Sequence, residues 1–451
     1  MGPAARLRAG PAAVLAALVA TTAAGCATYI DRVGQATRAA SRGDYVDGVS
    51  DMNRVLGVES ADELPNTWSG DRPLAALERG SLQQALGRYL SATRDLSAAE
   101  QELELLDLSA DAIGALATYL YSDSAKNYKT PPTERLALNA VNLLNYLAVG
   151  DLDGAAVEAR RFQVMRDYLD SENIAAEGPA TLGAYLAGFV FEHRGEGDRA
   201  LRYYEEALAG RPLDSLTAPV ARLAQSNPYR GPRLSDTLSR ATTATGGARP
   251  AAELLVVLSL GRVPHKEPKR IPVGAAVGLA GVYATGDVDW LKYGAAKVVA
   301  YPELVSTPSV LGPPAVRVDG RSVAVDALTD LGAAIRDEYD EAEPKIIAAA
   351  LTRMAARAAL AEGVRALGRK EDKLLGDIVS LVFEAAMVVV DRPDTRSWTM
   401  LPDRVLVARV PTVPGPHTVD VSFAGTPGAG RTLTVEVPPA GYAAVVITEP
   451  R

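Results

Sequence analysis

Apolar residues in the first 240 positions recur at helical spacing, and glycines separate the apolar stretches. Three glycines are followed by small or apolar residues at the same offsets of five, nine and twelve positions: Gly80 by Ala85, Tyr89 and Ala92, Gly150 by Ala155, Ala159 and Phe162, and Gly195 by Ala200, Tyr204 and Ala207. A glycine ends a helix well because it adopts the left-handed cap conformation, and residues three or four apart share one helix face. The pattern predicts successive helix pairs, each with a small residue at a close crossing.

The offsets resemble those of the tetratricopeptide repeat (TPR), a helix–turn–helix unit of about 34 residues. The intervals are 37 residues from Gly43, which begins a weaker copy, to Gly80, then 70 to Gly150 and 45 to Gly195. The last interval fits one unit with an insertion around 170–180. The copy over 181–214 matches best, with Gly188 in the small-residue position of its first helix, and a further unit is expected near 103–121. The alternative is a set of unrelated amphipathic helix pairs, and both interpretations make this half helical.

The middle of the chain changes character twice. Residues 227–250 contain several prolines and glycines, which interrupt helices, so a linker is expected there. The apolar run Glu253–Leu260 predicts a buried strand. Residues 271–283 are rich in Gly, Ala and Val and too few to span a membrane, so irregular strands at a core are expected.

Helical spacing returns with Leu328, Leu331, Ile335 and Tyr339, and the apolar stretch 374–390 predicts a buried core helix. Near the end, four strands are expected over 405–410, 417–423, 432–437 and 442–448, because turn residues separate them and the second and third alternate polar with apolar positions. Together these strands predict a small antiparallel sheet or half-sandwich of about 50 residues.

The sequence therefore predicts an α+β protein that is mainly α. Its expected parts are a signal peptide (1–25), a TPR-like helical-repeat domain (26–226), a linker (227–250), a β-rich middle region (251–325), a helical segment (326–392) and a C-terminal β module (393–451).

The N-terminus has the layout of a secretory signal. Arg6 and Arg8 precede the apolar run 12–20, and Ala23-Ala24-Gly25-Cys26 follows it. This last motif resembles the lipobox of bacterial lipoproteins, which implies that Cys26 is acylated and becomes the new N-terminus. Ala27 stands where an inner-membrane retention signal would place Asp, so an outer-membrane anchor facing the periplasm is expected. The alternative is an ordinary cleaved signal followed by a buried cysteine.

The charge and the cysteine content of the chain exclude some classes of partner and a disulfide. Cys26 is the only cysteine, so lipidation leaves no thiol for a disulfide. The net charge is −8, and removal of Arg6 and Arg8 with the signal leaves −10. This charge argues against nucleic acid, whose binding depends on neutralising phosphates with Lys and Arg. It also argues against electrostatic attraction to anionic lipids, so the acyl chains would anchor the protein.

Catalytic and cofactor motifs are missing from the sequence. His193, His265 and His417 are isolated from one another, so no metal site is expected. The stretch Gly363–Lys370 superficially resembles a phosphate-binding loop, but it lies within a helical pattern and Glu371 follows where Ser or Thr would hold magnesium. The sequence favours a non-enzymatic scaffold without cofactor or metal. The alternative is an envelope enzyme, or a regulator of a cell-wall enzyme, that acts through the C-terminal strands.

Candidate partner-binding residues follow from the TPR-like register. The concave surface of such an array is formed by the first helix of each pair, and in the best copy Tyr185, Phe189 and His193 would face it. Aromatic side chains carry much interface energy, so Tyr185 and Phe189 are the expected anchors for a periplasmic or envelope protein. Asn139, Asn142 and Asn145 are expected on the same surface or on a solvated outer stripe. The alternative for the aromatic residues is a place in the core.

Three short motifs point to one group of proteins. They are Asp394-Thr395-Arg396-Ser397-Trp398 with Leu401-Pro402, Tyr119-Leu120-Tyr121 and Glu158-Ala159-Arg160-Arg161. Together they resemble a poorly characterised family of bacterial TPR-like helical-repeat lipoproteins. The resemblance implies a lipidated N-terminus joined to TPR-like helices, and it implies no activity.

Overall fold

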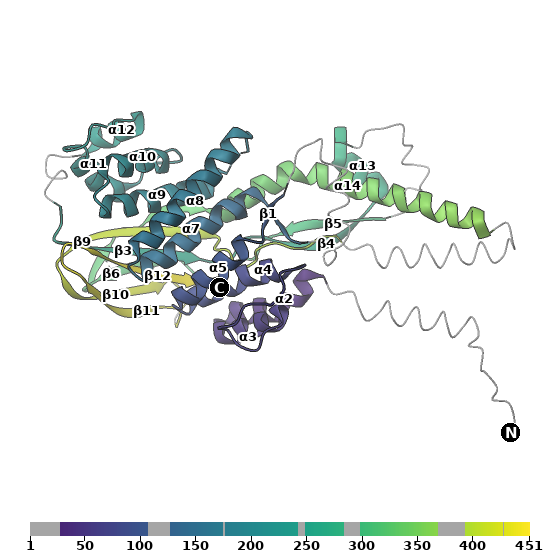
Figure 1. The fold of residues 1–451 in the computed structure, drawn as a ribbon, viewed down its shortest axis with the longest axis horizontal. Coiled ribbons are helices and arrows are strands. Elements are labelled where there is room, and N and C mark those ends of the chain that lie inside the picture. The colour runs from purple at the N-terminus through teal and green to yellow at the C-terminus, as the bar shows by residue number, and fades with distance from the viewer. Residues whose placement is uncertain are drawn as a thin grey trace, which may run out of the picture.

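The computed structural model describes residues 28–106, 127–174, 176–241, 249–283, 298–368, 393–426 and 428–451. Its body has three layers: the N-terminal helices cover one face of a four-stranded sheet, and a second four-stranded sheet covers the other face (Figure 1). The predicted α+β class is confirmed, with N-terminal helix pairs packed like repeats and strands at the C-terminal end. Cys26 and the motif at 119–121 lie outside the described residues.

Within the described ranges, four helix pairs form the helical layer, and each pair packs on the next one along the chain. They are α2 (Tyr29–Arg42) with α3 (Tyr45–Leu56), α4 (Arg72–Ala85) with α5 (Tyr89–Glu100), α7 (Pro132–Ala148) with α8 (Leu152–Ser171), and α9 (Glu177–His193) with α10 (Gly197–Ala207). Two short strands, β1 (Glu104–Leu105) and β2 (Lys129–Thr130), lie between the second and third pairs. Helix α8 has 20 residues, which accounts for the longer interval expected around 170–180.

Glycines with positive φ connect the two helices of each pair, but one expected register is wrong. Gly43, Gly87, Gly150 and Gly195 have φ angles of 82°, 71°, 77° and 79°, and each lies two residues before the second helix. The second copy therefore turns at Gly87, whereas Gly80 lies inside α4, where an added Cβ would come within 2.8 Å of Leu96. Gly80 allows α4 to pack closely against Leu96 of α5. The residues that follow Gly80 have the spacing expected after a turn glycine, which explains the wrong register.

With turns at Gly43, Gly87, Gly150 and Gly195, the residue five positions after each turn is small and buried between paired helices. Ala92, Ala155 and Ala200 occupy this position and are completely buried, and Gly48 fills it in the first pair. In the last pair the helices are so close that a Cβ added to Gly188 would lie 2.4 Å from the Tyr204 ring. Small residues therefore set the distance at which paired helices cross.

Part of the expected linker is a helix. Helices α11 (Thr217–Leu223) and α12 (Pro232–Arg240) extend the array, and the Glu205 carboxylate of α10 accepts the backbone N–H groups of Arg233 and Leu234 at 3.2 and 2.9 Å. Pro232 begins α12, where its fixed φ is favourable and its missing N–H costs nothing. The expectation of a linker treated every proline as a helix breaker, so it did not include α12.

The first sheet has the order β12-β3-β9-β8. Its strands are β12 (Tyr442–Glu449), β3 (Ala252–Leu260), β9 (Arg404–Thr412) and β8 (Asp326–Asp330). The second sheet has the order β11-β10-β6-β7, with β11 (Arg431–Val437), β10 (Gly415–Phe423), β6 (Pro314–Val318) and β7 (Arg321–Val323). Strand β3 pairs in parallel with β12 and antiparallel with β9.

Strand β3 lies at the centre of the body, and all nine of its residues are buried. Leu255 and Val257 pack against the helices, whereas Leu254, Val256 and Leu258 face the second sheet. The four C-terminal strands form as predicted, but they do not pair into a sheet of their own. They share both sheets with strands from the middle region, because an isolated small sheet would leave its apolar faces exposed.

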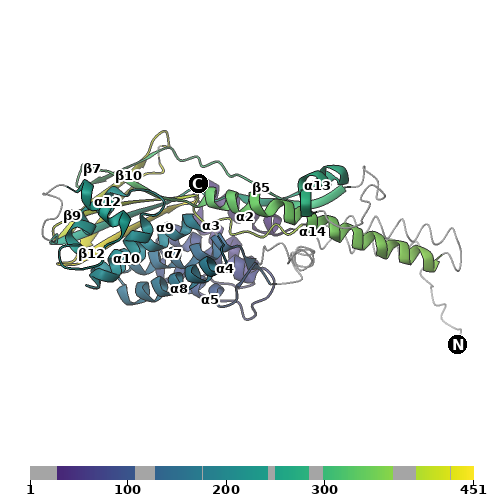
Figure 2. The ribbon, with the colours of Figure 1, turned by 90° about the horizontal axis from the view of Figure 1, so that it is seen from above.

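A long helix and a two-stranded ribbon extend beyond the body (Figures 1 and 2). Strands β4 (His265–Pro272) and β5 (Val298–Val305) form the ribbon, which packs with α13 (Val273–Ala280) on α14 (Leu331–Gly368). The irregular strands expected over 271–283 are therefore wrong: Val273, Ala276 and Ala280 share one face of a helix that packs in the same core as α14. Leu328 belongs to β8 rather than to the helix. The core helix expected over 374–390 lies outside the described residues.

We predict that Ala200→Trp destabilises the protein, because an indole at a completely buried helix crossing overpacks the core. The expected loss is about 1–3 kcal/mol in the free energy of unfolding. Leu90→Trp on α5, where the leucine is 71% exposed, is the matched control and should leave stability unchanged. Thermal unfolding followed by circular dichroism measures both. Equal midpoints for the two variants would contradict the assigned crossing.

Candidate functional site

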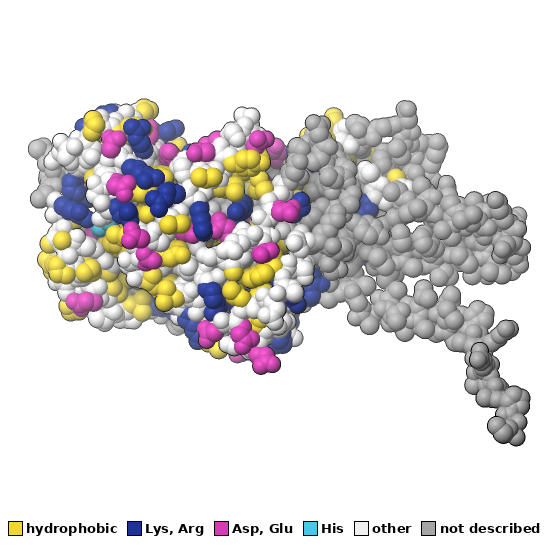
Figure 3. Space-filling model, viewed as in Figure 1, with side chains coloured by type: hydrophobic (Ala, Val, Ile, Leu, Met, Phe, Trp, Pro, Cys, Tyr) yellow, Lys and Arg dark blue, Asp and Glu magenta, His cyan; other side chains and the backbone are white. Residues whose placement is uncertain are grey.

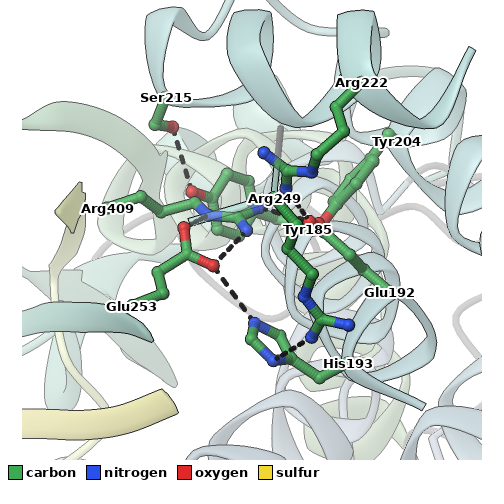
Figure 4. Close-up of polar contacts among 9 residues, drawn as sticks. All are labelled: Tyr185, Glu192, His193, Tyr204, Ser215, Arg222, Arg249, Glu253 and Arg409. Atoms are coloured by element: carbon green, nitrogen blue, oxygen red, sulfur yellow. Dashed lines mark hydrogen bonds and ion pairs between the residues drawn. The ribbon is translucent and has the colours of Figure 1, made fainter. Parts of the chain in front are cut away.

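The concave side of the helical array is occupied by the chain's own sheet and by the segment 394–402. Tyr185 and Phe189 are completely buried, and Phe189 meets the Tyr442 ring of β12 edge-to-face at 5.1 Å. The Tyr185 hydroxyl donates to Ser215 at 3.0 Å (Figure 4). Both side chains lie in the core, which is the alternative that the sequence left open. Their expected role as anchors for an outside partner does not fit this geometry, because no surface of either ring is accessible.

Charged side chains connect the helices to the sheet in the same place. Arg409 of β9 donates two hydrogen bonds to Glu253 of β3, at 2.8 and 2.7 Å. Its Nη1 also donates to Glu192 of α9 at 3.1 Å and to the Tyr204 hydroxyl at 2.9 Å. Arg222 forms an ion pair with Glu192 (Figure 4). The Arg409 side chain is 2% exposed, so this cluster lies in the interior.

Mutual attraction sets the ionisation of the cluster. Burial by itself would raise the pKa of Glu253, but the Arg409 guanidinium and the His193 hydrogen bond hold that pKa well below its ordinary value. The same guanidinium lowers the pKa of Glu192, and the two carboxylates raise the pKa of Arg409 against the effect of burial. All three groups are therefore charged together, and the cluster holds α9 against the sheet.

His193 lies at the edge of this cluster and has two polar neighbours. Its Nε2 is 3.1 Å from the Glu253 carboxylate, and Arg249 donates to its Nδ1 at 3.2 Å. Because Nδ1 accepts from an arginine, Nε2 carries the hydrogen that faces Glu253. The residue therefore joins the segment before β3 to α9, and its ring is not presented to a partner.

Asn139, Asn142 and Asn145 are buried, so neither the binding surface nor the solvated stripe expected for them is correct. The Asn139 amide donates to Glu100 at 2.8 Å and to Glu158 at 3.1 Å. Asn142 donates to Ser97, and Asn145 accepts from Gln84 at 2.8 Å. The three asparagines, three residues apart on α7, thus form hydrogen bonds with α4, α5 and α8. Buried amides need such partners because an unpaired polar group in the interior is costly.

The segment 394–402 packs against α4 and α7 and turns at Trp398–Leu401, where the Leu401 N–H donates to the Trp398 carbonyl at 3.3 Å. Both Glu78 oxygens accept backbone N–H groups, from Thr399 and Met400, each at 2.7 Å. Glu134 accepts the Trp398 N–H at 3.1 Å, and the Trp398 indole donates to Ser81 at 3.0 Å. The Trp/Leu-Pro motif seen in the sequence therefore packs against the helical array of the same chain. Glu78 and Glu134 are buried on the first helices of their pairs, and the sequence analysis did not single them out.

An open cleft lies on the other side of α9, where α8 ends and α14 begins. Its volume is about 900 Å3, and its apolar lining includes Tyr168, Ile174 and Ala333. Tyr168 is 49% exposed. The acidic residues of the lining are Glu172, Asp330, Asp337, Glu338 and Glu341, and its basic residues are Arg211 and Lys345. The lining of the cleft therefore combines apolar side chains with an excess of acidic ones.

The chemistry that this cleft offers is recognition of positive charge. Asp337 and Glu341 are exposed and lie one helical turn apart on α14. Burial raises the pKa of Glu338 to about 7, and Glu338 accepts the Thr133 N–H at 2.8 Å. Periodicity did not reveal the cleft, because its walls come from segments separated by more than 150 residues.

The described residues contain neither a membrane-spanning helix nor a metal-binding cluster. Among the helices of the described ranges, none has the length together with the hydropathy that crossing a bilayer requires. In the same part of the chain, His, Cys, Asp and Glu side chains form no group of three or more placed to hold a metal ion.

We predict that the protein loses stability as pH rises from about 4.5 to 7. Burial raises the pKa of both Glu78 and Glu338 to about 7, so the folded chain binds more protons than the unfolded chain in this window. The free energy of unfolding should fall by about 1–3 kcal/mol per group. Urea unfolding at several pH values measures the slope, and Glu338→Gln should reduce it because an amide oxygen still accepts the Thr133 N–H.

The exposed Glu436→Gln on β11 serves as the control for this experiment and should leave the slope unchanged. A stability that stays flat or increases between pH 4.5 and 7 would show that these carboxyls are not held protonated by the fold.

No protein-family model, curated protein or solved structure matches this chain. The resemblance to bacterial TPR-like lipoproteins therefore rests on the sequence motifs, of which those at 158–161 and 394–402 lie in the described residues.

Proposed function

We propose that this protein is a lipid-anchored scaffold of the bacterial envelope that binds another envelope protein in the cleft between α8, α9 and α14. The observation that carries the proposal is the cleft itself: it is concave, partly apolar and negatively charged, and it lies outside the groove that the chain fills with its own sheet. A repeat array whose concave side is closed can still bind partners through other surfaces.

The lining defines the kind of partner. Without Glu338, whose pKa burial raises to about 7, four acidic residues face two basic ones in the lining. The cleft keeps an excess of negative charge, so the complementary segment carries Lys or Arg. The apolar part of the lining, formed by Tyr168, Ile174 and Ala333, suits apolar side chains between those charges. The same excess of negative charge repels the phosphates of nucleic acid, in agreement with the net charge of −8.

The proposed anchor would hold the helical array close to the membrane. Cys26 is separated from α2 by Ala27 and Thr28 alone. Two extended residues span about 7 Å, so α2 would begin near the lipid headgroups. This short tether is consistent with a scaffold that works at the membrane surface rather than one that reaches across the periplasm.

Cys26→Ser tests the anchor. Without acyl chains the protein should appear in the soluble periplasmic fraction or stay unprocessed, because the negatively charged chain has no electrostatic affinity for anionic lipids. Fractionation and immunoblotting give the distribution. A Cys26→Ser protein that still sediments with the outer membrane would mean that another contact holds it there.

A photo-crosslinking amino acid at Glu172, which is exposed in the cleft, tests the partner surface. We expect it to capture an envelope protein through a segment that contains Lys or Arg, located by mass spectrometry. Asp337→Lys with Glu341→Lys should reduce the yield at least tenfold, because charge reversal repels such a segment.

The matched control is Asp236→Lys with Glu436→Lys, two exposed positions outside the cleft. It changes the net charge equally and should leave the yield unchanged. Capture that survives the cleft reversal, or that falls equally in the control, would refute the cleft as the binding surface.

A further inference from the structure

The outward face of α8 forms a second surface that the cleft does not include. Val157 and Val164 lie seven residues apart on one side of the helix and are 41% and 70% exposed. Beside them is a hollow of about 500 Å3 between α8 and the neighbouring parts of α5 and α7, to which Met165 also contributes. On the face drawn in Figure 3, hydrophobic side chains lie next to Lys and Arg over the helical half.

Three arginines line this hollow, which we call the α8 hollow. They are Arg135 of α7 and Arg160 and Arg161 of α8, and the one acidic residue of the lining is Glu100. Arg161 forms ion pairs with Glu100 and Glu158, each at 3.0 Å. Arg160 is exposed and has no ion pair within the described ranges. The hollow therefore has basic side chains in excess of its acidic ones.

Arg135 carries the strongest indication of a ligand. Its side chain is 14% exposed, and its nearest carboxylate oxygen, from Glu100, is 3.6 Å from Nη2. Its Nη1 is buried and has no hydrogen-bond acceptor among the residues that the structure describes. Burial also lowers the pKa of Arg135, which shows that its charge is incompletely compensated. Nη1 has no accessible surface, so Arg135 attracts an anionic ligand to the hollow through its charge and not through a direct contact.

We propose that the α8 hollow binds an acidic, partly apolar segment of another protein. In this arrangement a carboxylate lies at the exposed Arg160, where the charges of Arg135 and Arg161 also attract it, and an apolar side chain packs on Val164 and Met165. The surface is separate from the acidic cleft and takes a partner segment of opposite charge. The inference therefore does not rest on the function proposed for the cleft.

The geometry favours a protein segment over a lipid surface. A flat bilayer surface does not match the concave lining of the hollow, whereas an inserted side chain does. Guanidinium groups match carboxylates because two parallel N–H groups meet two oxygens. The seven-residue spacing of Val157 and Val164 also matches the repeat along an amphipathic helix, the usual occupant of such a surface.

Fluorescence anisotropy with the purified mature protein tests the inference. The probe is a labelled amphipathic peptide with Glu and Leu on one face, and the control probe has Gln in place of each Glu. We expect the Glu peptide to bind at least tenfold more tightly, and its affinity to fall with added salt. Arg160→Glu with Val164→Ser should weaken binding at least tenfold without changing the unfolding midpoint, because both side chains are exposed.

Arg42→Glu with Val46→Ser is the matched control, since both residues are exposed on the first helix pair. It should leave the affinity unchanged. Equal binding of the Glu and Gln peptides, or equal loss in both double variants, would overturn the proposal. Sedimentation with phosphatidylglycerol vesicles that depends on Arg160 and Val164, or self-association that depends on them, would overturn it in favour of a lipid surface or a second copy.

Discussion

The fold depends on burying strand β3 on both faces, with its charged end paired to the helices. Glu253 stands at the start of an otherwise apolar strand, on the same face as Leu255 and Val257. Its carboxylate can be buried there because Arg409 supplies two hydrogen bonds and also bonds Glu192 of α9. Burying charges is expensive unless each one is paired and hydrogen-bonded. This cluster therefore fixes where the helical array meets the sheet.

Docking of the sheet determines which surfaces remain for other molecules. The first helices of a TPR-like array normally offer their concave side to a ligand, but here Phe189 contacts Tyr442 of β12, and Glu78 holds the backbone of Thr399 and Met400. The occupant of the groove is part of the same chain. The open surfaces of the described residues include the acidic cleft at one end of α8 and the basic hollow on its outer face.

These two surfaces have opposite charge although the chain as a whole is negative. Acidic residues of α14 face one, and arginines of α7 and α8 line the other. A scaffold with this arrangement can bind two different segments at once, and each surface disfavours the ligand of the other through charge repulsion.

Local sequence determined the elements of this protein, because helical and strand periodicity depend on residues a few positions apart. The helix pairs, the small residues at their crossings and the four C-terminal strands could be predicted in this way. The occupant of the groove, the strand order and the ion pairs could not, because they join residues far apart in the chain, such as Glu253 with Arg409 and Glu78 with Thr399. Only the tertiary structure decides such contacts, since many distant segments have compatible polarity and packing selects among them.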